Sequence, residues 1–393
     1  MAAFSTSPRA GYDGVVVAAP VTVPYRRYSI NSAHWWIGRA LRGLCDAARL
    51  TPADLDGFSV SSFTLAPDTA IGLTQHFGLS PRWLDFIPMG GASGVLALRK
   101  AARAVQAGDA TVVACVAGDT NHVDSFRRTL STFSRFAQDA VYPYGSGGPN
   151  ANFALIMANY MRLTGATRED IGKLAVAQRA NALHFPHALM KKPLSLADYL
   201  NARPISDPIH LFDCVMPCAG AEAFLVMREA DARAHGLPFA RILGSIERHN
   251  AFAEDVIQYR GGWAVDIDAL YAQAGIAKGK VDFVETYDDY PVISMMQLED
   301  LGLCARGTVA EFVRGNSFTV DGSCPHNTSG GQLSVGQAGC AGGYLGLVEA
   351  IRQLTGQALG AQVKEARVGL VSGFGMITYD RGLASCAALL GSA

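Results

Sequence analysis

Hydrophobic and polar residues along this chain form blocks that predict buried strands and helices in regular succession. Short apolar runs, of the kind buried inside parallel sheets, occur at residues 14–19, 57–61, 111–117, 223–226, 241–246, 280–284 and 368–375. Longer segments with apolar residues at helical spacing occur between them, at residues 32–48, 68–77, 151–163, 167–182, 266–274 and 294–301. Strands that alternate with helices in this way indicate an α/β protein.

One arrangement of a glycine-rich turn, a helix and a buried strand occurs twice. In the first copy a turn that contains Gly91 precedes the helix of residues 95–105 and the strand of residues 111–117. The second copy consists of residues 339–356 and the strand of residues 368–375. A duplication at this separation predicts two similar halves rather than a short-period repeat. Two helix starts that converge on one pocket would offer N–H groups to an oxyanion or a thioester carbonyl.

The composition is that of an ordinary globular protein, with 393 residues, 49% of them hydrophobic and 17% charged. A formal net charge of -1 argues against nucleic acid or an anionic membrane as a partner. We see no membrane-spanning run and no secretory signal, so we expect a cytoplasmic protein. Cys214 and Cys218 are the one close pair among 8 cysteines. Without a second pair at zinc-site spacing, we expect reduced thiols and no metal site.

Three motifs near the C-terminus follow one another in an order that is typical of a known family. They are Asn327-Thr-Ser-Gly-Gly331, the glycine-rich residues 336–343, and residues 348–354. Upstream, residues 199–214 and 220–223 match the mid-chain signature of the same family. The chain therefore resembles the thiolase superfamily, most closely its sterol-carrier-protein-type thiolases, over nearly its whole length. The resemblance implies the thiolase fold, in which two similar α/β halves form a five-layered αβαβα sandwich.

The same resemblance implies how the chain is divided. The first half takes residues 1–239, including a loop domain at about 121–205, and the second half takes residues 240–393. Each half would hold a mixed five-stranded sheet, and the helices that begin near Gly94 and Gly343 would be the two central helices. The strand at residues 111–117 matches the strand by which thiolases pair their sheets across a two-fold axis, which implies a homodimer.

The residues that carry thiolase chemistry are replaced in this chain. Gly91 stands where the family has its nucleophilic cysteine, Gln337 stands at the family's histidine, and Ser372 stands at about its second cysteine. A glycine cannot attack a thioester, and neither glutamine nor serine is a good base at neutral pH. We therefore do not expect thiolysis or Claisen condensation through an acyl-cysteine.

Tyrosines occupy this region instead. Tyr344 follows the second glycine turn, Tyr287 stands at the family's Asn or His position, and Tyr290 stands at its phenylalanine. The pattern resembles the thiolase-like aldolases of bacterial steroid side-chain degradation, which lack the nucleophilic cysteine and in which active-site tyrosines are implicated. The resemblance implies retro-aldol cleavage of a β-hydroxy acyl-CoA by a homodimer that binds a small OB-fold protein with a zinc ribbon.

The residues fit this chemistry. In a retro-aldol cleavage the β-hydroxyl loses a proton while the α-carbon leaves as a thioester enolate, so no cysteine is needed and fixed donors hold the enolate oxygen. Tyr344 is the first choice for proton transfer, with Tyr287 and Tyr290 as further candidates. Coenzyme A would enter as part of the substrate, and no covalently bound cofactor is expected. The residues expected to bind substrate and oxyanion are Gly91, Ser93, Asn327, Gln337, Gly339, Ser372 and Gly373.

Two other interpretations remain open. One keeps cysteine chemistry but moves it to Cys324 or Cys340, with His326 as the base. Cys340 lies inside the second glycine turn, where the start of a helix lowers the pKa of a thiol. The other interpretation is a non-catalytic subunit that binds acyl-CoA or a partner protein. A neighbouring gene for a small OB-fold protein would favour the aldolase, and one for an active thiolase would favour the non-catalytic subunit.

Overall fold

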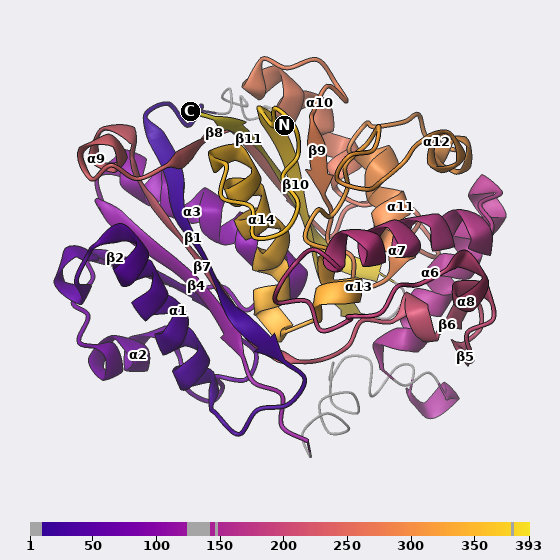
Figure 1. The fold of residues 1–393 in the computed structure, drawn as a ribbon, viewed down its shortest axis with the longest axis horizontal. Helices are drawn as coiled ribbons and strands as arrows, with labels where there is room; N and C mark the ends of the chain where they lie inside the picture. Colours follow the sequence, from indigo (N-terminus) through magenta and orange to yellow (C-terminus); the bar gives the residue numbers. More distant parts are fainter. Residues whose placement is uncertain (1–9, 124–141, 146–147, 379–380) are drawn as a thin grey trace, which may run out of the picture.

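The computed structural model describes residues 10–123, 142–145, 148–378 and 381–393, and its main feature is a nine-stranded mixed sheet (Figure 1). The strands follow in the order β3-β2-β4-β7-β1-β8-β11-β10-β9. The first half of the chain contributes β1 (Val15–Arg26), β2 (Gly57–Ser61), β3 (Trp83–Phe86), β4 (Val112–Asp119) and β7 (Ala219–Arg228). The second half contributes β8 (Phe239–His249), β9 (Phe283–Glu285), β10 (Val368–Thr378) and β11 (Arg381–Ser392).

The two halves of the sheet repeat one topology. In the first half β2 pairs parallel with β4, and antiparallel pairs then lead to β7 and β1. In the second half β9 pairs parallel with β10, and antiparallel pairs lead to β11 and β8. β1 and β8 pair antiparallel, with Val17 opposite Ala240, and join the halves. The predicted duplication is thus confirmed, although the second half has four strands in the described part of the chain, where five were predicted, because β3 has no counterpart.

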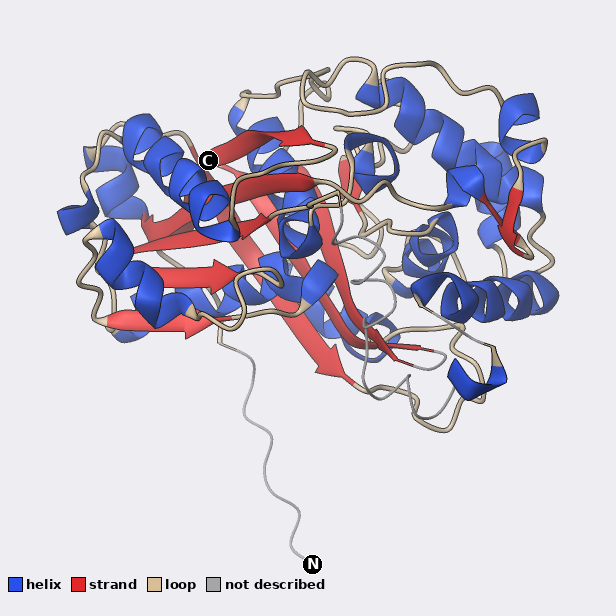
Figure 2. Cartoon of the chain, turned by 90° about the horizontal axis from the view of Figure 1, so that it is seen from below, coloured by secondary structure: helices blue, strands red, loops and turns tan. Residues whose placement is uncertain are grey.

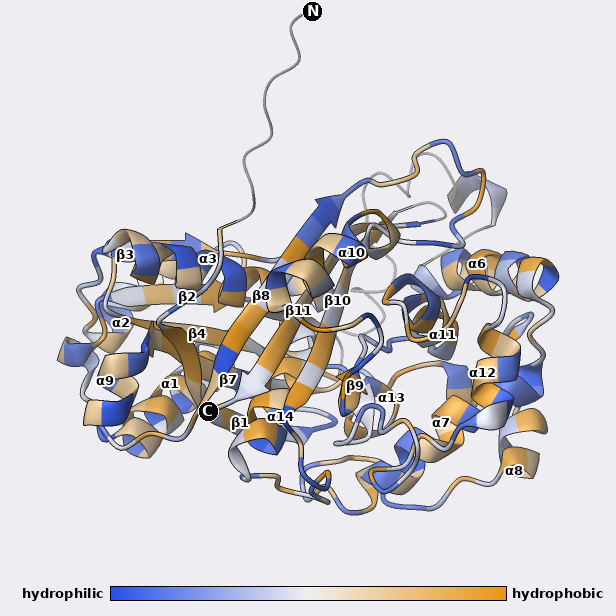
Figure 3. Ribbon diagram, turned by 90° about the horizontal axis from the view of Figure 1, so that it is seen from above, coloured by the Kyte–Doolittle hydropathy of each residue, from blue (hydrophilic) through white to orange (hydrophobic). Residues whose placement is uncertain are grey.

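Two helices lie at the centre of the fold, as the resemblance to the thiolase fold implied. α3 (Ser93–Ala107) and α14 (Gly342–Thr355) pack on each other and on strands of both halves. α1 (Ala33–Ala48) packs on β1, β4 and β7, and α10 (Trp263–Ala274) packs on β8 and β11. Helices and strands therefore alternate in five layers. The central strands are apolar along most of their length (Figure 3), because both of their faces are buried.

The starts of the two central helices touch through their backbones. A Cβ atom added to Gly94 would lie 2.3 Å from the carbonyl oxygen of Gly343, and one added to Gly343 would lie 2.4 Å from the carbonyl oxygen of Gly90. Any larger residue would force the helices apart, so glycine is required for this close approach. The contact brings the N-terminal turns of both helices to one place.

The loop domain of the described residues is mainly helical and lies against the second half. Its α7 (Arg168–Ala182) packs on α11 (Pro291–Asp300), α12 (Val309–Gly315) and α13 (Gly331–Val335). The side chain of Thr167 caps α7 by accepting from the N–H of Asp170. Figure 2 shows these helices gathered to one side of the strands. Much of the predicted irregular stretch lies outside the described residues. The remaining elements are α2 (Ala70–Phe77), α6 (Pro149–Thr164), α8 (Leu196–Leu200), β5 (Pro204–Ser206), β6 (Ile209–His210) and α9 (Glu229–Ala234).

One prediction about the sheet is wrong. The strand at residues 111–117, expected to pair across a dimer axis, is β4, and it is hydrogen-bonded to β2 on one side and to β7 on the other. It has no open edge to offer to a second chain. Its continuous apolar run reflects burial on both faces, which an interior strand needs more than an edge strand does. Within the described residues the edges of the sheet are β3 and β9.

Candidate active site

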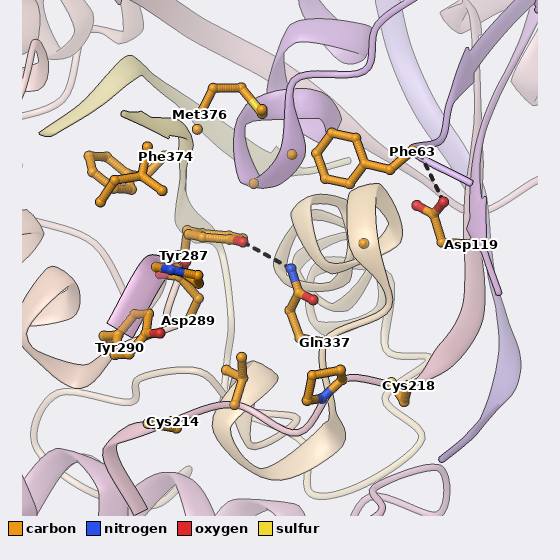
Figure 4. Close-up of a pocket in the computed structure, with 18 of the residues that line it drawn as sticks. Phe63, Asp119, Cys214, Cys218, Tyr287, Asp289, Tyr290, Gln337, Phe374 and Met376 are labelled. Carbon is orange, nitrogen blue, oxygen red and sulfur yellow. Dashed lines mark hydrogen bonds between the residues drawn. The ribbon is translucent and has the colours of Figure 1, made fainter. Parts of the chain in front are cut away.

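A cavity of ≈ 240 Å³ lies where parallel strands end and the two central helices begin (Figure 4). The segments that follow β2 and β4 line one side of it, and the segment after β9 together with the end of β10 lines another. Ligands of α/β proteins bind at the carboxyl ends of parallel strands, and the positive ends of the helix dipoles of α3 and α14 point to the same place. The cavity is therefore the candidate active site.

The first glycine turn explains why a nucleophile is missing. Gly91 lines the cavity, and a Cβ atom added to it would lie 2.2 Å from Cε2 of Tyr287 and 2.3 Å from the carbonyl oxygen of Phe374. The space that a cysteine side chain would need is thus occupied by the ring of Tyr287. Glycine at 91 and tyrosine at 287 are consequently coupled, because the ring fits only where a side chain is absent.

Tyr287 presents its hydroxyl to the cavity. It lies between β9 and α11, and Nε2 of Gln337 approaches its hydroxyl oxygen at 3.5 Å (Figure 4). Burial raises the pKa of the Tyr287 hydroxyl well above its usual value, and the nearby Asp289 raises it further. The hydroxyl therefore keeps its proton at neutral pH and acts as a donor.

Tyr290 has a different role because its proton is already engaged. Its hydroxyl donates to Oδ1 of Asn150, and its ring stacks on Phe153 with the ring centroids 4.0 Å apart. Burial raises the pKa of Tyr290 well above its usual value, and Cys214 and Asp289 add to the shift. Tyr290 lines the cavity as a fixed wall that a bound molecule would contact.

The sequence interpretation passed over Asp289, which the structure places in the cavity wall between the two tyrosines. Its Oδ1 is inaccessible to solvent and has no hydrogen-bond partner among the described residues. Burial raises the pKa of Asp289 well above its usual value, and the charge of Asp288 raises it further. The signal was present in the sequence, since two adjacent carboxylates come three residues after a buried strand that ends at Glu285. Asp288 differs, because it accepts the backbone N–H groups of Gln332 and Leu333 at 2.9 and 3.3 Å.

A second carboxylate at the cavity, Asp119, holds the two halves of the site together. Its Oδ1 accepts hydrogen bonds from Ser62, Phe63 and Thr64 in the segment after β2, and its Oδ2 accepts the N–H of Cys340 at 2.7 Å. These donors come from the segment after β2 in the first half and from the turn before α14 in the second half. Asp119 is therefore a structural link between the halves.

The structure brings five of the predicted site residues together. These five, which all line the cavity, are Gly91, Tyr287, Tyr290, Gln337 and Gly339. Asn327 and Ser372 instead line a smaller cavity of ≈ 10 Å³, which Tyr287 also borders. Ser372 donates to Gln297 at 2.6 Å, and Asn327 accepts the N–H of Thr286 at 2.8 Å, so both support the segment that carries Tyr287.

Other predicted residues lie in the core instead. The hydroxyl of Tyr344 lies 3.2 Å from Oγ of Ser61, and its ring packs beside Phe224, away from the cavity. Its place in the first turn of α14 directs it toward the strands of the first half, which corrects its selection as the first choice for proton transfer. Ser93 is also buried and bonds the backbone of Ile87 and Met89 at 2.9 and 3.0 Å. Gly373 packs against the backbone of Gly91, and it does not line the cavity.

The relocated-cysteine interpretation does not fit the structure. Neither Cys324, Cys340 nor His326 lines the cavity. Burial raises the pKa of Cys340 well above its usual value, and that of Cys324 to about 11, so both thiols stay protonated at neutral pH. Burial also lowers the pKa of His326 to about 3, and its Nε2 is 2.7 Å from Oγ1 of Thr286. At Cys340 desolvation outweighs the helix start that was expected to lower the pKa.

Comparison with known proteins identifies the family. The model of the "Thiolase C-terminal domain-like" family matches residues 253–384. Over 92% of its length the chain is 30% identical to the "17-hydroxy-3-oxo-4-pregnene-20-carboxyl-CoA lyase" of Mycobacterium tuberculosis, of which it covers 97%. This chain belongs to the thiolase-like aldolases. It is also 30% identical, over 86% of its length and 89% of the relative, to the "Steroid side-chain-cleaving aldolase" of Thermomonospora curvata.

Solved structures agree with this membership. The structure of an "Ltp2-ChsH2(DUF35) aldolase" matches 96% of this thiolase-like aldolase and 98% of that chain, with a TM-score of 0.82 and 27% sequence identity. Human mitochondrial 3-ketoacyl-CoA thiolase matches 98% of the chain and 100% of its own, with a TM-score of 0.69 and 15% identity, which shows the shared fold. In the described residues no helix is long and apolar enough to cross a membrane.

Proposed function

We propose that this thiolase-like aldolase cleaves the bond between the α- and β-carbons of a β-hydroxy acyl-CoA. The observation that carries the proposal is the position of Tyr287. Its ring occupies the place of the thiolase nucleophile beside Gly91, and its hydroxyl points into the cavity. A donor at that position suits a reaction in which an oxygen gains negative charge and no bond to the protein forms.

In the proposed reaction the proton leaves the β-hydroxyl and the carbon–carbon bond breaks. The electron pair of that bond passes to the α-carbon and the thioester oxygen as an enolate. Tyr287 and the N–H groups at the starts of α3 and α14 are the donors that would hold this oxygen. The α-carbon then takes up a proton, so the products are one ketone or aldehyde and one shorter acyl-CoA.

The cavity wall favours a bulky apolar acyl group. The cavity has an apolar wall that consists of Phe63, Phe153, Phe374, Met376 and Ile377. Two similar proteins are named for steroid substrates, one of them for a steroid acyl-CoA. We therefore propose a steroid or another lipid side chain as the acyl group, with coenzyme A as part of the substrate.

We also propose that the enzyme works with a protein partner. The matching solved structure is named for two components, Ltp2 and ChsH2(DUF35). A small OB-fold protein with a zinc ribbon, bound to a homodimer of this chain, is the assembly that the family resemblance implies. The homodimer and the cytoplasmic location stay predictions.

The test is a comparison of two tyrosine variants. With the CoA ester that gives the mycobacterial relative its name as substrate, Tyr287→Phe should lower kcat by roughly 10²-fold or more, since it removes a positioned proton donor. Tyr344→Phe should keep nearly full activity, because Tyr344 does not line the cavity. Both variants should bind an analogue that lacks the β-hydroxyl as the wild type does. Full activity of Tyr287→Phe would contradict the proposal.

A further inference from the structure

We propose that Asp289 is the general base of the cleavage, accepting the proton of the substrate's β-hydroxyl and returning it to the α-carbon. The proposal rests on the proposed retro-aldol function and extends it to a residue that the family motifs do not mark. It stands on the position of the carboxylate in the cavity wall and on the absence of a hydrogen-bond partner for its Oδ1 among the described residues.

The other polar groups of the cavity do not meet the requirement for a base. Asp119 is held by donors from Ser62, Phe63, Thr64 and Cys340. Gln337 is an amide and does not accept a proton at neutral pH. Among the described residues that line the cavity, Asp289 is the carboxylate whose Oδ1 has no hydrogen-bond partner. Because that oxygen is shielded while the residue as a whole is partly exposed, the carboxylate would meet a substrate hydroxyl through its other oxygen, Oδ2.

The two tyrosines are donors rather than acceptors, which assigns the base to the carboxylate between them. The hydroxyl of Tyr290 donates to Asn150, and that of Tyr287 faces Gln337. Both keep their protons at neutral pH, since burial raises the pKa of each well above its usual value. Tyr287 would donate to the oxygen that becomes negative while Asp289 removes the hydroxyl proton.

Asp289 both removes the proton and returns it, so the reaction neither consumes nor releases a proton. The ionised Asp289 carboxylate takes the β-hydroxyl proton as the carbonyl of the ketone forms and the carbon–carbon bond breaks. The electron pair of that bond moves onto the α-carbon and the thioester oxygen. The protonated carboxyl then gives the same proton to the α-carbon, which restores the carboxylate and yields the shorter acyl-CoA. No oxidant, reductant or further reactant is consumed.

The surroundings of Asp289 make it a stronger base than an exposed carboxylate. The titratable groups that face it are Asp288, Tyr287 and Tyr290 on its own segment and Cys214 on the segment before β7. Burial and the neighbouring Asp288 raise its pKa. Only the ionised form accepts a proton, so the cleavage rate should rise with pH until Asp289 is ionised.

The experiment compares Asp289→Asn with Asp289→Glu and with the surface control Asp268→Asn, whose carboxylate is 84% exposed. The readouts are the pH profile of kcat/KM for cleavage and, separately, exchange of the α-hydrogen of the product acyl-CoA in D₂O, followed by mass spectrometry. Asp289→Asn should lose at least 10²-fold in both, and the rising limb of its pH profile should disappear. Asp289→Glu should retain part of both activities, and Asp268→Asn should match the wild type.

A stability measurement separates a catalytic role from a structural one. An acid whose pKa is raised by folding adds stability below its unfolded pKa and loses it as pH rises through the folded pKa. Asp289→Asn should therefore melt at the same temperature as the wild type or higher at pH 8, while being inactive. A lower melting temperature with unchanged exchange per folded molecule would overturn the proposal.

The outcomes distinguish this inference from the proposed function. One outcome is that the wild type cleaves the substrate and Asp289→Asn keeps both the wild-type cleavage rate and the rise of kcat/KM with pH. The retro-aldol function then stands, and the assignment of Asp289 as the base fails. If the wild type cleaves no β-hydroxy acyl-CoA but exchanges the product α-hydrogen in an Asp289-dependent way, the base assignment stands and the proposed reaction fails. Loss of neither activity in Asp289→Asn refutes the assignment.

Discussion

At the scale of single residues, the main feature of the site is that the ring of Tyr287 occupies the space beside Gly91 in which a thiolase has its cysteine side chain. The thiolase resemblance puts a cysteine at position 91 and Asn or His at 287, whereas this chain has glycine at 91 and a tyrosine ring in the space beside it. The replaced cysteine was visible in the sequence. The sequence did not show that the ring fills its place, because the two positions are far apart in the chain and meet only in the folded structure.

This packing predicts how substitutions at position 91 behave. Gly91→Ala should destabilise the protein by about 1–3 kcal/mol, since its Cβ would lie 2.2 Å from the ring of Tyr287. The same change in a Tyr287→Ala background should cost less, because the ring is gone. Chemical denaturation of the four proteins in this double-mutant cycle gives the coupling. Equal costs in the two backgrounds would show that the ring does not occupy this space.

A further prediction concerns Gly91→Cys. The variant should show no thiolase activity, because Tyr287 blocks the thiol and Gln337 replaces the histidine that would activate it. The measurement is thioester formation between the new cysteine and an acyl-CoA, detected as a mass increase of the intact protein. A stable acyl adduct that forms at neutral pH would contradict this prediction.

Tyr344 illustrates what the sequence could not decide. Its place after the second glycine turn suggested a catalytic group. The direction in which a helical side chain points, however, depends on how the helix is rotated about its axis relative to the sheet. The structure buries it beside Ser61. Tyr344→Phe should therefore cost about 1 kcal/mol of stability through the lost hydrogen bond and leave kcat nearly unchanged. Thermal melting and the cleavage assay measure the two effects, and a large loss of kcat at unchanged stability would restore Tyr344 as a catalytic residue.

At the scale of elements, the glycine turns and the helices after them were the most predictable features. The periodicity placed α3 and α14, and the resemblance to the thiolase fold implied that they are the two central helices. The edge of the sheet was less predictable. An apolar run such as that of β4 shows that a strand is buried but does not show which strands lie beside it.

The crossing of the central helices gives a prediction with a matched control. Gly94→Ala should destabilise the protein by about 3 kcal/mol and disturb the cavity, since its Cβ would lie 2.3 Å from the carbonyl oxygen of Gly343. Gly72→Ala, on the exposed side of α2 where a Cβ meets nothing within 4 Å, should stabilise by roughly 0.5–1 kcal/mol. Urea denaturation measures both, and a neutral Gly94→Ala would rule out the backbone contact.

At the scale of the whole molecule, the fold and the family could be predicted from the sequence motifs. The full set of residues in the candidate active site could not. The motifs fixed the glycine turns around the cavity, but Asp289 carries no family signature and emerged from its position after β9 and its unpaired oxygen. Homodimer formation stays a prediction, and β4 is not available for it. Light scattering should give twice the chain mass of 41.6 kDa, and a mass of one chain would contradict it.

The central claim is that cleavage transfers no acyl group, and dependence on free coenzyme A tests it most directly. Purified protein, with any OB-fold partner present, would be incubated with a β-hydroxy acyl-CoA in the absence and presence of free coenzyme A, and all products identified by mass spectrometry. We predict one ketone or aldehyde and one shorter acyl-CoA at a rate that does not depend on free coenzyme A. Cleavage that requires free coenzyme A and yields two acyl-CoA products would contradict the account.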